Sequence, residues 1–116
     1  LDELTTTGAS FVSEAKNGAV RSFTVTPEDA GLPRAAPEDL KGGDPGENAL
    51  ALRRLLDGEP GPYRDIALLN AAATLIVAGR AACLREGADL AGKSIDDGRA
   101  RQALARLVAI SNEQAP

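Results

Sequence analysis

The pattern of apolar and polar positions predicts a β-hairpin near the start of the chain. Two alternating runs, 10–16 and 19–26, are separated by Asn17-Gly18. Asn-Gly favours a type I′ turn, because both central residues of that turn need a positive φ. The two-residue loop implies a register that pairs Lys16 with Ala19, Glu14 with Arg21 and Val12 with Phe23. One pair is then oppositely charged and another is apolar, and both combinations stabilise a hairpin.

The longest apolar stretch, Arg64–Leu84, predicts a central helix that is buried on several sides and closes at Glu86-Gly87. No charged residue occurs from Ile66 to Gly79, and apolar residues lie almost all round the helical wheel. The Ala residues and Gly79 would let neighbouring elements approach closely, whereas Leu and Ile residues and Val77 fill the remaining space. The uncharged stretch is shorter than the ~20 residues that a membrane-spanning helix needs. We therefore expect a scaffold helix inside a packed domain.

Turn and capping residues delimit the other helices. Residues 44–47 combine an Asp N-cap, a Pro at the first helical position and a Glu that completes a capping box, and the helix they open ends at Gly58. Pro37–Leu40 predicts a short helical turn, and two more helices are expected at Ala88 to about Asp97 and at about Arg99 to Ser111. The last helix is expected to turn its apolar residues inward, namely Ala103, Leu104, Leu107, Val108 and Ile110. The prediction is an α+β chain with one hairpin followed by four or five packed helices.

The composition excludes several kinds of chemistry. With no His and a single Cys, the chain has no internal disulfide, Cys/His zinc site or His-based catalytic triad, so any metal would be held by oxygen. A net charge of −4 without a basic run argues against nucleic acid and anionic membrane surfaces as partners. No leader sequence is visible, which favours the cytoplasm. Because the chain contains no Met, we expect it to be a piece of a longer protein.

Two short polar stretches could bind ligands. Asp2-Glu3 is a pair of adjacent carboxylates of the kind that holds Mg²⁺ together with substrate phosphates, although a solvated acidic terminus is the commoner explanation of such a pair. Gly42-Gly43-Asp44 could hold a phosphate at a helix start. A helix stop followed by an N-cap explains these residues better, because Asp44 is negative and Pro45 lacks an N–H donor.

Four single residues are further candidates. Asn70 lies in the apolar stretch, and its amide is expected to bond to neighbouring backbone, with ligand contact as the alternative. Cys83 is expected to be a small buried residue rather than a reactive thiol. Arg34 and Lys41 could bind anions, but they are isolated in the sequence.

Several short sequence motifs follow one another along the chain. They are Leu1-Asp2-Glu3 with Thr5-Thr6-Thr7, TVTPEDAGL at 24–32, DLKGGD at 39–44 followed by Glu47-Asn48-Ala49, and Arg64-Asp65-Ile66 with Leu68-Leu69-Asn70-Ala71-Ala72. Together these strings resemble the carboxyl-terminal third of the anthranilate phosphoribosyltransferase family. A non-enzymatic helical interaction or regulatory module, and a relative of pyrimidine nucleoside phosphorylase, are the alternatives.

The resemblance implies a fold and an activity. Residues 1–116 would be the carboxyl-terminal part of the α/β catalytic domain of a nucleoside-phosphorylase/phosphoribosyltransferase-type fold, with the amino-terminal helical domain and the glycine-rich loop for 5-phosphoribosyl diphosphate (PRPP) absent. The intact enzyme would be a Mg²⁺-dependent homodimer that transfers phosphoribose from PRPP to anthranilate in tryptophan synthesis. The chain alone would be inactive, and an exposed sheet edge could let it self-associate.

The resemblance also implies a metal site. In the family, an Asp-Glu pair that follows Gly-Leu helps to bind Mg²⁺ and, through it, the diphosphate. The corresponding residues here are Asp2 and Glu3, although the preceding Gly of that motif is not in the sequence. Asp2 and Glu3 are therefore the predicted metal ligands.

Overall fold

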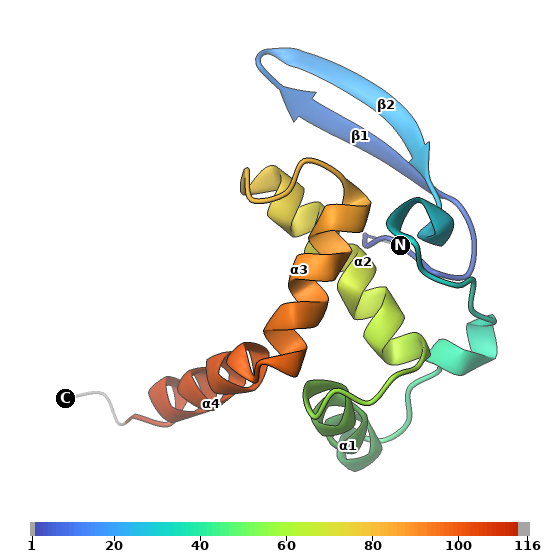
Figure 1. The fold of residues 1–116 in the computed structure, drawn as a ribbon. Helices are drawn as coiled ribbons and strands as arrows, with labels where there is room; N and C mark the ends of the chain where they lie inside the picture. The colour runs from blue at the N-terminus through green and yellow to red at the C-terminus, as the bar shows by residue number, and fades with distance from the viewer. Residues whose placement is uncertain (1, 114–116) are drawn as a thin grey trace.

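A computed structural model describes residues 2–113, in which a β-hairpin lies beside a group of helices (Figure 1). The elements are β1 (Ser10–Lys16), β2 (Ala19–Val25), the 3₁₀ turns η1 (Pro27–Ala30) and η2 (Pro37–Leu40), and the helices α1 (Pro45–Leu56), α2 (Pro62–Val77), α3 (Leu84–Asp96) and α4 (Arg99–Ser111). Leu1, which belongs to the Leu-Asp-Glu string, and residues 114–116 lie outside the described residues. The predicted arrangement of a hairpin followed by helices is confirmed.

The hairpin has the predicted turn and register. Asn17 and Gly18 have φ values of 52° and 76°, which is the left-handed pair that a type I′ turn requires. β1 and β2 pair antiparallel, with Glu14 opposite Arg21 and Val12 opposite Phe23. The charged pair is closed by a 3.2 Å ion pair between Arg21 Nη2 and Glu14 Oε1. Local turn chemistry therefore set the pairing of both strands.

The hairpin buries only one of its faces. Val12, Phe23 and Val25 pack towards the helices, and Val25 belongs to the buried core. On the other face Phe11 is 90% exposed, and Val20 is exposed as well. In the described part of the chain this sheet consists of the two hairpin strands.

The predicted central helix was too long, because α2 ends at Val77. Gly79 has a φ of 68°, its N–H donates to Ile76 O at 3.0 Å, and the N–H of Arg80 donates to Leu75 O at 2.8 Å. These two bonds form a Schellman motif, in which a left-handed Gly ends a helix and satisfies its last carbonyls. Gly79 is therefore the stop signal of α2 and not a point of close packing within a longer helix.

The early stop changes the assignment of the residues that follow. α3 begins at Leu84 instead of the predicted Ala88, so Gly87 lies inside α3 and does not close the central helix. Val77, which was expected to fill interior space, is 87% exposed at the end of α2. No helix in the described part of the chain is both long and apolar enough to cross a membrane.

The core centres on a close approach of α2 and α3. Leu69 and Ala72 of α2 are completely buried, and Gly87 of α3 lies against Ala72. A Cβ atom added at Gly87 would lie 2.7 Å from Ala72 Cα, 2.8 Å from its Cβ and 2.9 Å from its carbonyl oxygen. The buried core cluster consists of Val25, Ala30, Leu68, Leu69, Ala72, Ala88, Ala91 and Ile95. Small residues thus allow the two backbones to come together.

A second contact ties the same helices at their other ends. Arg64, in the first turn of α2, donates from Nη1 to Asp96 Oδ1 at 2.8 Å and from Nη2 to Asp96 Oδ2 at 3.0 Å. Asp96 is the last residue of α3. The hydrogen bonds from Arg64 hold the pKa of the Asp96 carboxyl below its ordinary value. This two-point ion pair therefore favours the charged form of Asp96 in the folded chain.

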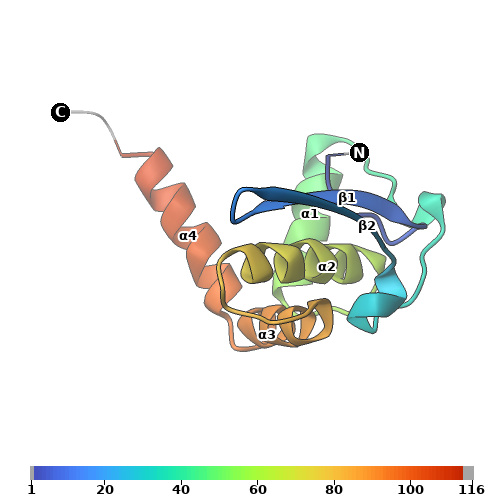
Figure 2. The ribbon, with the colours of Figure 1, turned by 90° about the horizontal axis from the view of Figure 1, so that it is seen from above.

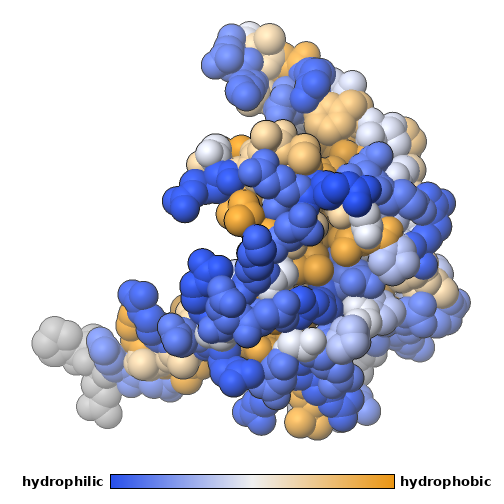
Figure 3. Space-filling model, in the orientation of Figure 1, coloured by the Kyte–Doolittle hydropathy of each residue, from blue (hydrophilic) through white to orange (hydrophobic). Residues whose placement is uncertain are grey.

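The last helix does not pack as predicted. α4 extends away from the other helices (Figure 2), and patches of apolar surface lie along it (Figure 3). Leu107 is 64% exposed, Val108 and Ile110 are also exposed, and only Leu104 is half-buried. The expectation that these residues and Ala103 face inward was wrong, because no described element covers that side of α4.

We predict opposite effects for two glycines of α3. Gly87→Ala should lower the free energy of unfolding by about 1–3 kcal/mol, because the new methyl group forces α2 and α3 apart. Gly92→Ala is the matched control, since its methyl group would lie 3.6 Å from Arg64 Nη2 and 4.0 Å from Leu68 Cδ2. Gly92→Ala should be neutral or stabilising by up to ~1 kcal/mol, because Ala is the better helix former. Denaturant unfolding measures both, and equal losses of stability would contradict the proposed contact.

Asp96→Asn should destabilise the chain near neutral pH but not in acid. A carboxyl whose pKa is lowered on folding adds stability above its unfolded pKa, close to 3.8 for Asp, and loses it as the pH falls through the folded pKa. The stability difference between the parent and Asp96→Asn should therefore shrink once the pH falls below that range. Denaturant unfolding at neutral and acid pH measures this, and a pH-independent difference would show that the ion pair is not its cause.

Candidate functional site

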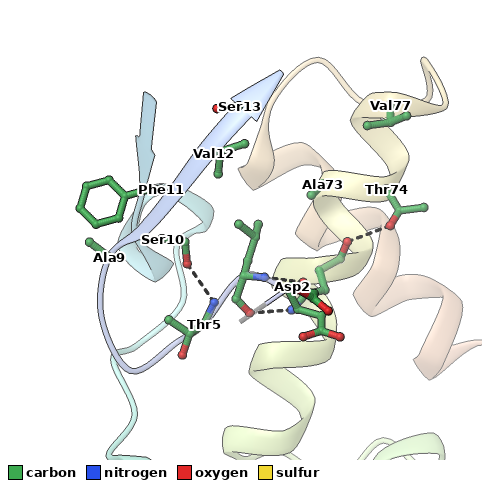
Figure 4. A pocket seen from close by; sticks show the side chains of 13 residues that line it. Asp2, Thr5, Ala9, Ser10, Phe11, Val12, Ser13, Ala73, Thr74 and Val77 are labelled. Carbon is green, nitrogen blue, oxygen red and sulfur yellow. Dashed lines mark hydrogen bonds between the residues drawn. The ribbon is translucent and has the colours of Figure 1, made fainter. Parts of the chain in front are cut away.

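An open groove of about 900 Å³ runs between the amino-terminal segment (residues 2–9), β1 and α2. Figure 4 shows Thr5 and Ser10 on one side, Ala73 and Thr74 of α2 on the other, and Asp2 between them. The complete lining consists of Asp2, Glu3, Leu4, Thr5, Ala9, Ser10, Phe11, Val12, Ser13, Asn70, Ala73, Thr74 and Val77. This groove brings the predicted metal ligands together with a face of the central helix.

The groove is acidic and otherwise uncharged. Asp2 and Glu3 are exposed, and they are the only charged residues among its described lining. The rest of the lining is apolar or carries hydroxyl and amide groups. A phosphate group entering this groove would meet two carboxylates and no cationic side chain, so the site needs a cation before it can attract a phosphate.

The acidic pair differs from the other adjacent acid pairs of the chain. Each of those pairs has at least one carboxylate with a structural role. Glu28 binds Arg34, Asp29 accepts from Thr26 N, and Asp39 accepts from Ala36 N. Asp96 binds Arg64, and Asp97 binds Arg99. No hydrogen bond or ion pair from the described residues engages the carboxylates of Asp2 or Glu3. Their side chains are therefore available to a ligand.

The segment after the acidic pair is bonded to other parts of the chain at Leu4, Thr5 and Thr6. Both the N–H and the carbonyl of Leu4 bond to the Asn70 side chain. Thr5 N–H donates to Ser10 Oγ at 3.0 Å, Thr6 O accepts from Ala35 N at 3.0 Å, and Thr7 N–H donates to Thr5 Oγ1 at 3.1 Å. Asp2 and Glu3 thus precede a firmly anchored stretch of backbone.

The chemistry of the acidic pair fits Mg²⁺ bound together with a substrate. The described residues contain no group of three or more Cys, Asp or Glu placed to hold a metal ion by themselves. Mg²⁺ typically takes one or two protein carboxylates, retains several waters and accepts oxygens from substrate phosphates. Asp2 and Glu3 could supply the protein's share of such a coordination shell.

The glycine-rich stretch before α1 is a helix start, as the sequence indicated. Asp44 Oδ1 accepts from Glu47 N at 2.9 Å, and Glu47 Oε2 accepts from Asp44 N at 2.9 Å. Asn48 adds a second clamp, because its Oδ1 accepts from Gly43 N and its Nδ2 donates to Gly43 O. Two carboxylates thus occupy the place that a phosphate would take.

The remaining candidate residues have mixed outcomes. Asn70 bonds to backbone, as expected, but to the distant Leu4 as well as to Ile66 in its own helix. Cys83 was expected to be buried and is exposed, because it lies at the N-cap of α3 and not within the central helix. Arg34 is not a free cation, since it binds Glu28 through two nitrogens and holds the pKa of Glu28 at about 2.

The chain belongs to the glycosyl transferase family, and residues 1–101 match the a/b domain of that family. Within the family, it is similar to proteins named anthranilate phosphoribosyltransferase. It is 69% identical to the one from Parvibaculum lavamentivorans, over 97% of this chain and 33% of that protein. It is 64% identical to the one from Methylocella silvestris, over 97% of this chain and 32% of that protein.

A solved structure agrees in fold as well as in sequence. The crystal structure of anthranilate phosphoribosyltransferase from Thermus thermophilus superposes with a TM-score of 0.83 at 44% identity, over 94% of this chain and 32% of that one. The chain therefore spans about a third of the length of the relatives it matches. The hairpin and helices form part of an α/β domain, and the comparisons favour the enzyme family over the two alternatives.

Proposed function

We propose that the intact protein transfers phosphoribose from PRPP to the amine of anthranilate and releases diphosphate, a step of tryptophan synthesis. The observation that supports this most strongly is the 69% identity to a protein named for that reaction. The family match over residues 1–101 supports the broader glycosyl transfer chemistry. The proposed phosphoribosyl transfer is an activity of the whole protein, and this chain would provide one part of its active site.

The proposal assigns residues 1–116 to the carboxyl-terminal part of the α/β catalytic domain. An amino-terminal helical domain and the PRPP loop would come from the rest of a longer protein. The match to an a/b domain and the coverage of about a third of each relative support this division. The acidic groove would then form one wall of an active site whose cationic phosphate contacts lie elsewhere.

The proposed cofactor is Mg²⁺, held by Asp2 and Glu3. The support is chemical, because two unengaged carboxylates line a groove whose described lining has no positive charge. When bound, the metal would supply positive charge that stabilises the departing diphosphate. The protein's own part is to place two oxygen ligands at the edge of the groove.

The assembly and location of the protein also belong to the proposal. We infer a cytoplasmic homodimer for the intact enzyme. For the chain on its own we infer self-association through the hairpin, because each of its strands pairs on one side only within the described residues. Unpaired strand edges are templates for pairing with another chain.

The activity assay should separate the intact protein from the chain. With PRPP and Mg²⁺, the intact protein should consume anthranilate, whereas the purified 116-residue chain should show no turnover. The groove beside the acidic pair has no cationic side chain among its described lining to hold the phosphates of PRPP. Loss of anthranilate fluorescence measures the reaction. Turnover by the chain would contradict the division of the site, and phosphorolysis of a pyrimidine nucleoside by the intact protein would favour that alternative.

Removing the acidic pair should impair the use of metal and not the fold. In the intact enzyme, replacing Asp2 and Glu3 together by Ala should raise the Mg²⁺ concentration for half-maximal activity by about 10-fold or more. The free energy of unfolding should change by no more than about 0.5 kcal/mol, because both side chains are exposed. Glu38→Gln with Glu59→Gln removes two other exposed charges and is the control. Identical Mg²⁺ titrations for both double variants would remove the metal role.

A further inference from the structure

The Asn70 side chain binds the backbone next to the acidic pair. Its Oδ1 accepts from Leu4 N at 2.9 Å, and its Nδ2 donates to Leu4 O at 2.9 Å and to Ile66 O at 3.0 Å. One side-chain amide thereby satisfies both backbone groups of Leu4, as a neighbouring β-strand would. The Ile66 bond fixes the amide to its own helix, so this contact connects the amino-terminal segment rigidly to α2.

The planarity of the peptide bond carries this constraint to the acidic pair. The N–H of Leu4 and the Cα and carbonyl of Glu3 belong to one rigid peptide unit. Fixing the Leu4 N–H against Asn70 therefore also fixes the Cα of Glu3, from which its carboxylate extends. The bonds further along, from Thr5 to Ser10 and from Ala35 to Thr6, hold the segment from its other end.

We propose that Asn70 is a positioning residue for the metal site, which it serves by fixing the backbone of Glu3, next to Asp2, at the edge of the groove. This inference rests on the proposed Mg²⁺ role of the acidic pair. Asn70 acts through Leu4 and is not itself a proposed metal ligand. Positioning matters here because two exposed side chains would otherwise lose much conformational freedom on binding a cation.

The chain contains a matched control for this interaction. Asn48 in α1 makes the same two-point clamp, with Gly43 N donating to its Oδ1 at 2.9 Å and its Nδ2 donating to Gly43 O at 3.1 Å. Asn48 and Gly43 do not line the acidic groove. Asn48→Ala therefore removes the same kind of backbone contact without touching the proposed metal site.

The test is a Mn²⁺ titration of the 116-residue chain followed by NMR. Mn²⁺ accepts the same oxygen ligands as Mg²⁺, and its unpaired electrons broaden the amide signals of nearby residues. The signals of the groove residues Thr5, Ser10 and Val12 should broaden at the lowest Mn²⁺ concentrations. Asn70→Ala should raise the Mn²⁺ concentration for half-broadening roughly 10-fold, whereas Asn48→Ala should leave it unchanged. Amide exchange of Leu4 should become faster in Asn70→Ala only.

The outcomes separate this inference from the proposed function. If Asp2→Asn with Glu3→Gln leaves the broadening of the groove signals unchanged, the acidic pair is not a metal site, and both proposals fail. If that double variant abolishes the broadening but Asn70→Ala and Asn48→Ala behave alike, only the positioning role of Asn70 is overturned.

A second variant covers the case in which Asn70→Ala does not fold. Asn70→Asp keeps the shape of the side chain and the acceptor for Leu4 N–H, but it loses both donors. Because it adds a negative charge near the groove, electrostatic attraction alone would strengthen cation binding. A fall in Mn²⁺ affinity would support positioning, and a rise would overturn it.

Discussion

The contact between Gly87 and Ala72 is the constraint on which the rest of the structure depends. Since a Cβ at Gly87 would lie within 3 Å of the Ala72 backbone, α2 and α3 can adopt this packing only where one helix has no side chain. Each residue of a helix advances by about 100°, so Asn70 and Ala72 point to nearly opposite sides of α2. The face that packs on α3 therefore leaves the opposite face to hold the amino-terminal segment. Helix packing and the placement of the acidic groove are two consequences of one helix orientation.

The same helix explains how a chain with few aromatic residues can organise a site. The core cluster of the chain consists of Ala, Leu, Ile and Val residues, and the buried Gly87 and Gly92 of α3 lie beside them. These residues allow short distances between helices but provide no polar chemistry. Two residues of α2 make polar contacts with distant parts of the chain. Asn70, on the groove side, bonds to Leu4, and Arg64, at the start of the helix, bonds to Asp96. The apolar helix α2 thus bonds through Asn70 to the backbone beside Asp2 and Glu3, and through Arg64 to Asp96. These carboxylates lie outside the apolar core, where burying a charge would be costly.

The adjacent acidic pairs differ in whether their carboxylates form hydrogen bonds or ion pairs, although their spacing in the sequence is the same. Four adjacent pairs of acidic residues occur in the chain, and by spacing alone they are equivalent. In the folded chain, the pairs at 28–29, 38–39 and 96–97 cap turns or bind arginines. The carboxylates of Asp2 and Glu3 have no such partner among the described residues, and they line the open groove beside α2. The resemblance to the enzyme family selected this pair from the sequence, and its metal role stays a prediction.

The sequence by itself determined the features whose cause lies within a few residues. The Asn17-Gly18 turn, the hairpin register and the Asp44 capping box followed from neighbouring residues, because their backbone angles and hydrogen bonds are local. The end of α2 was also local, but Gly79 was interpreted as a packing residue instead of a helix stop. Only the tertiary structure decided which surfaces are covered, as the exposed apolar side of α4 demonstrates. It alone joined Asn70 to Leu4 across 66 positions, because the partner of a side-chain amide is chosen by the packing of distant elements.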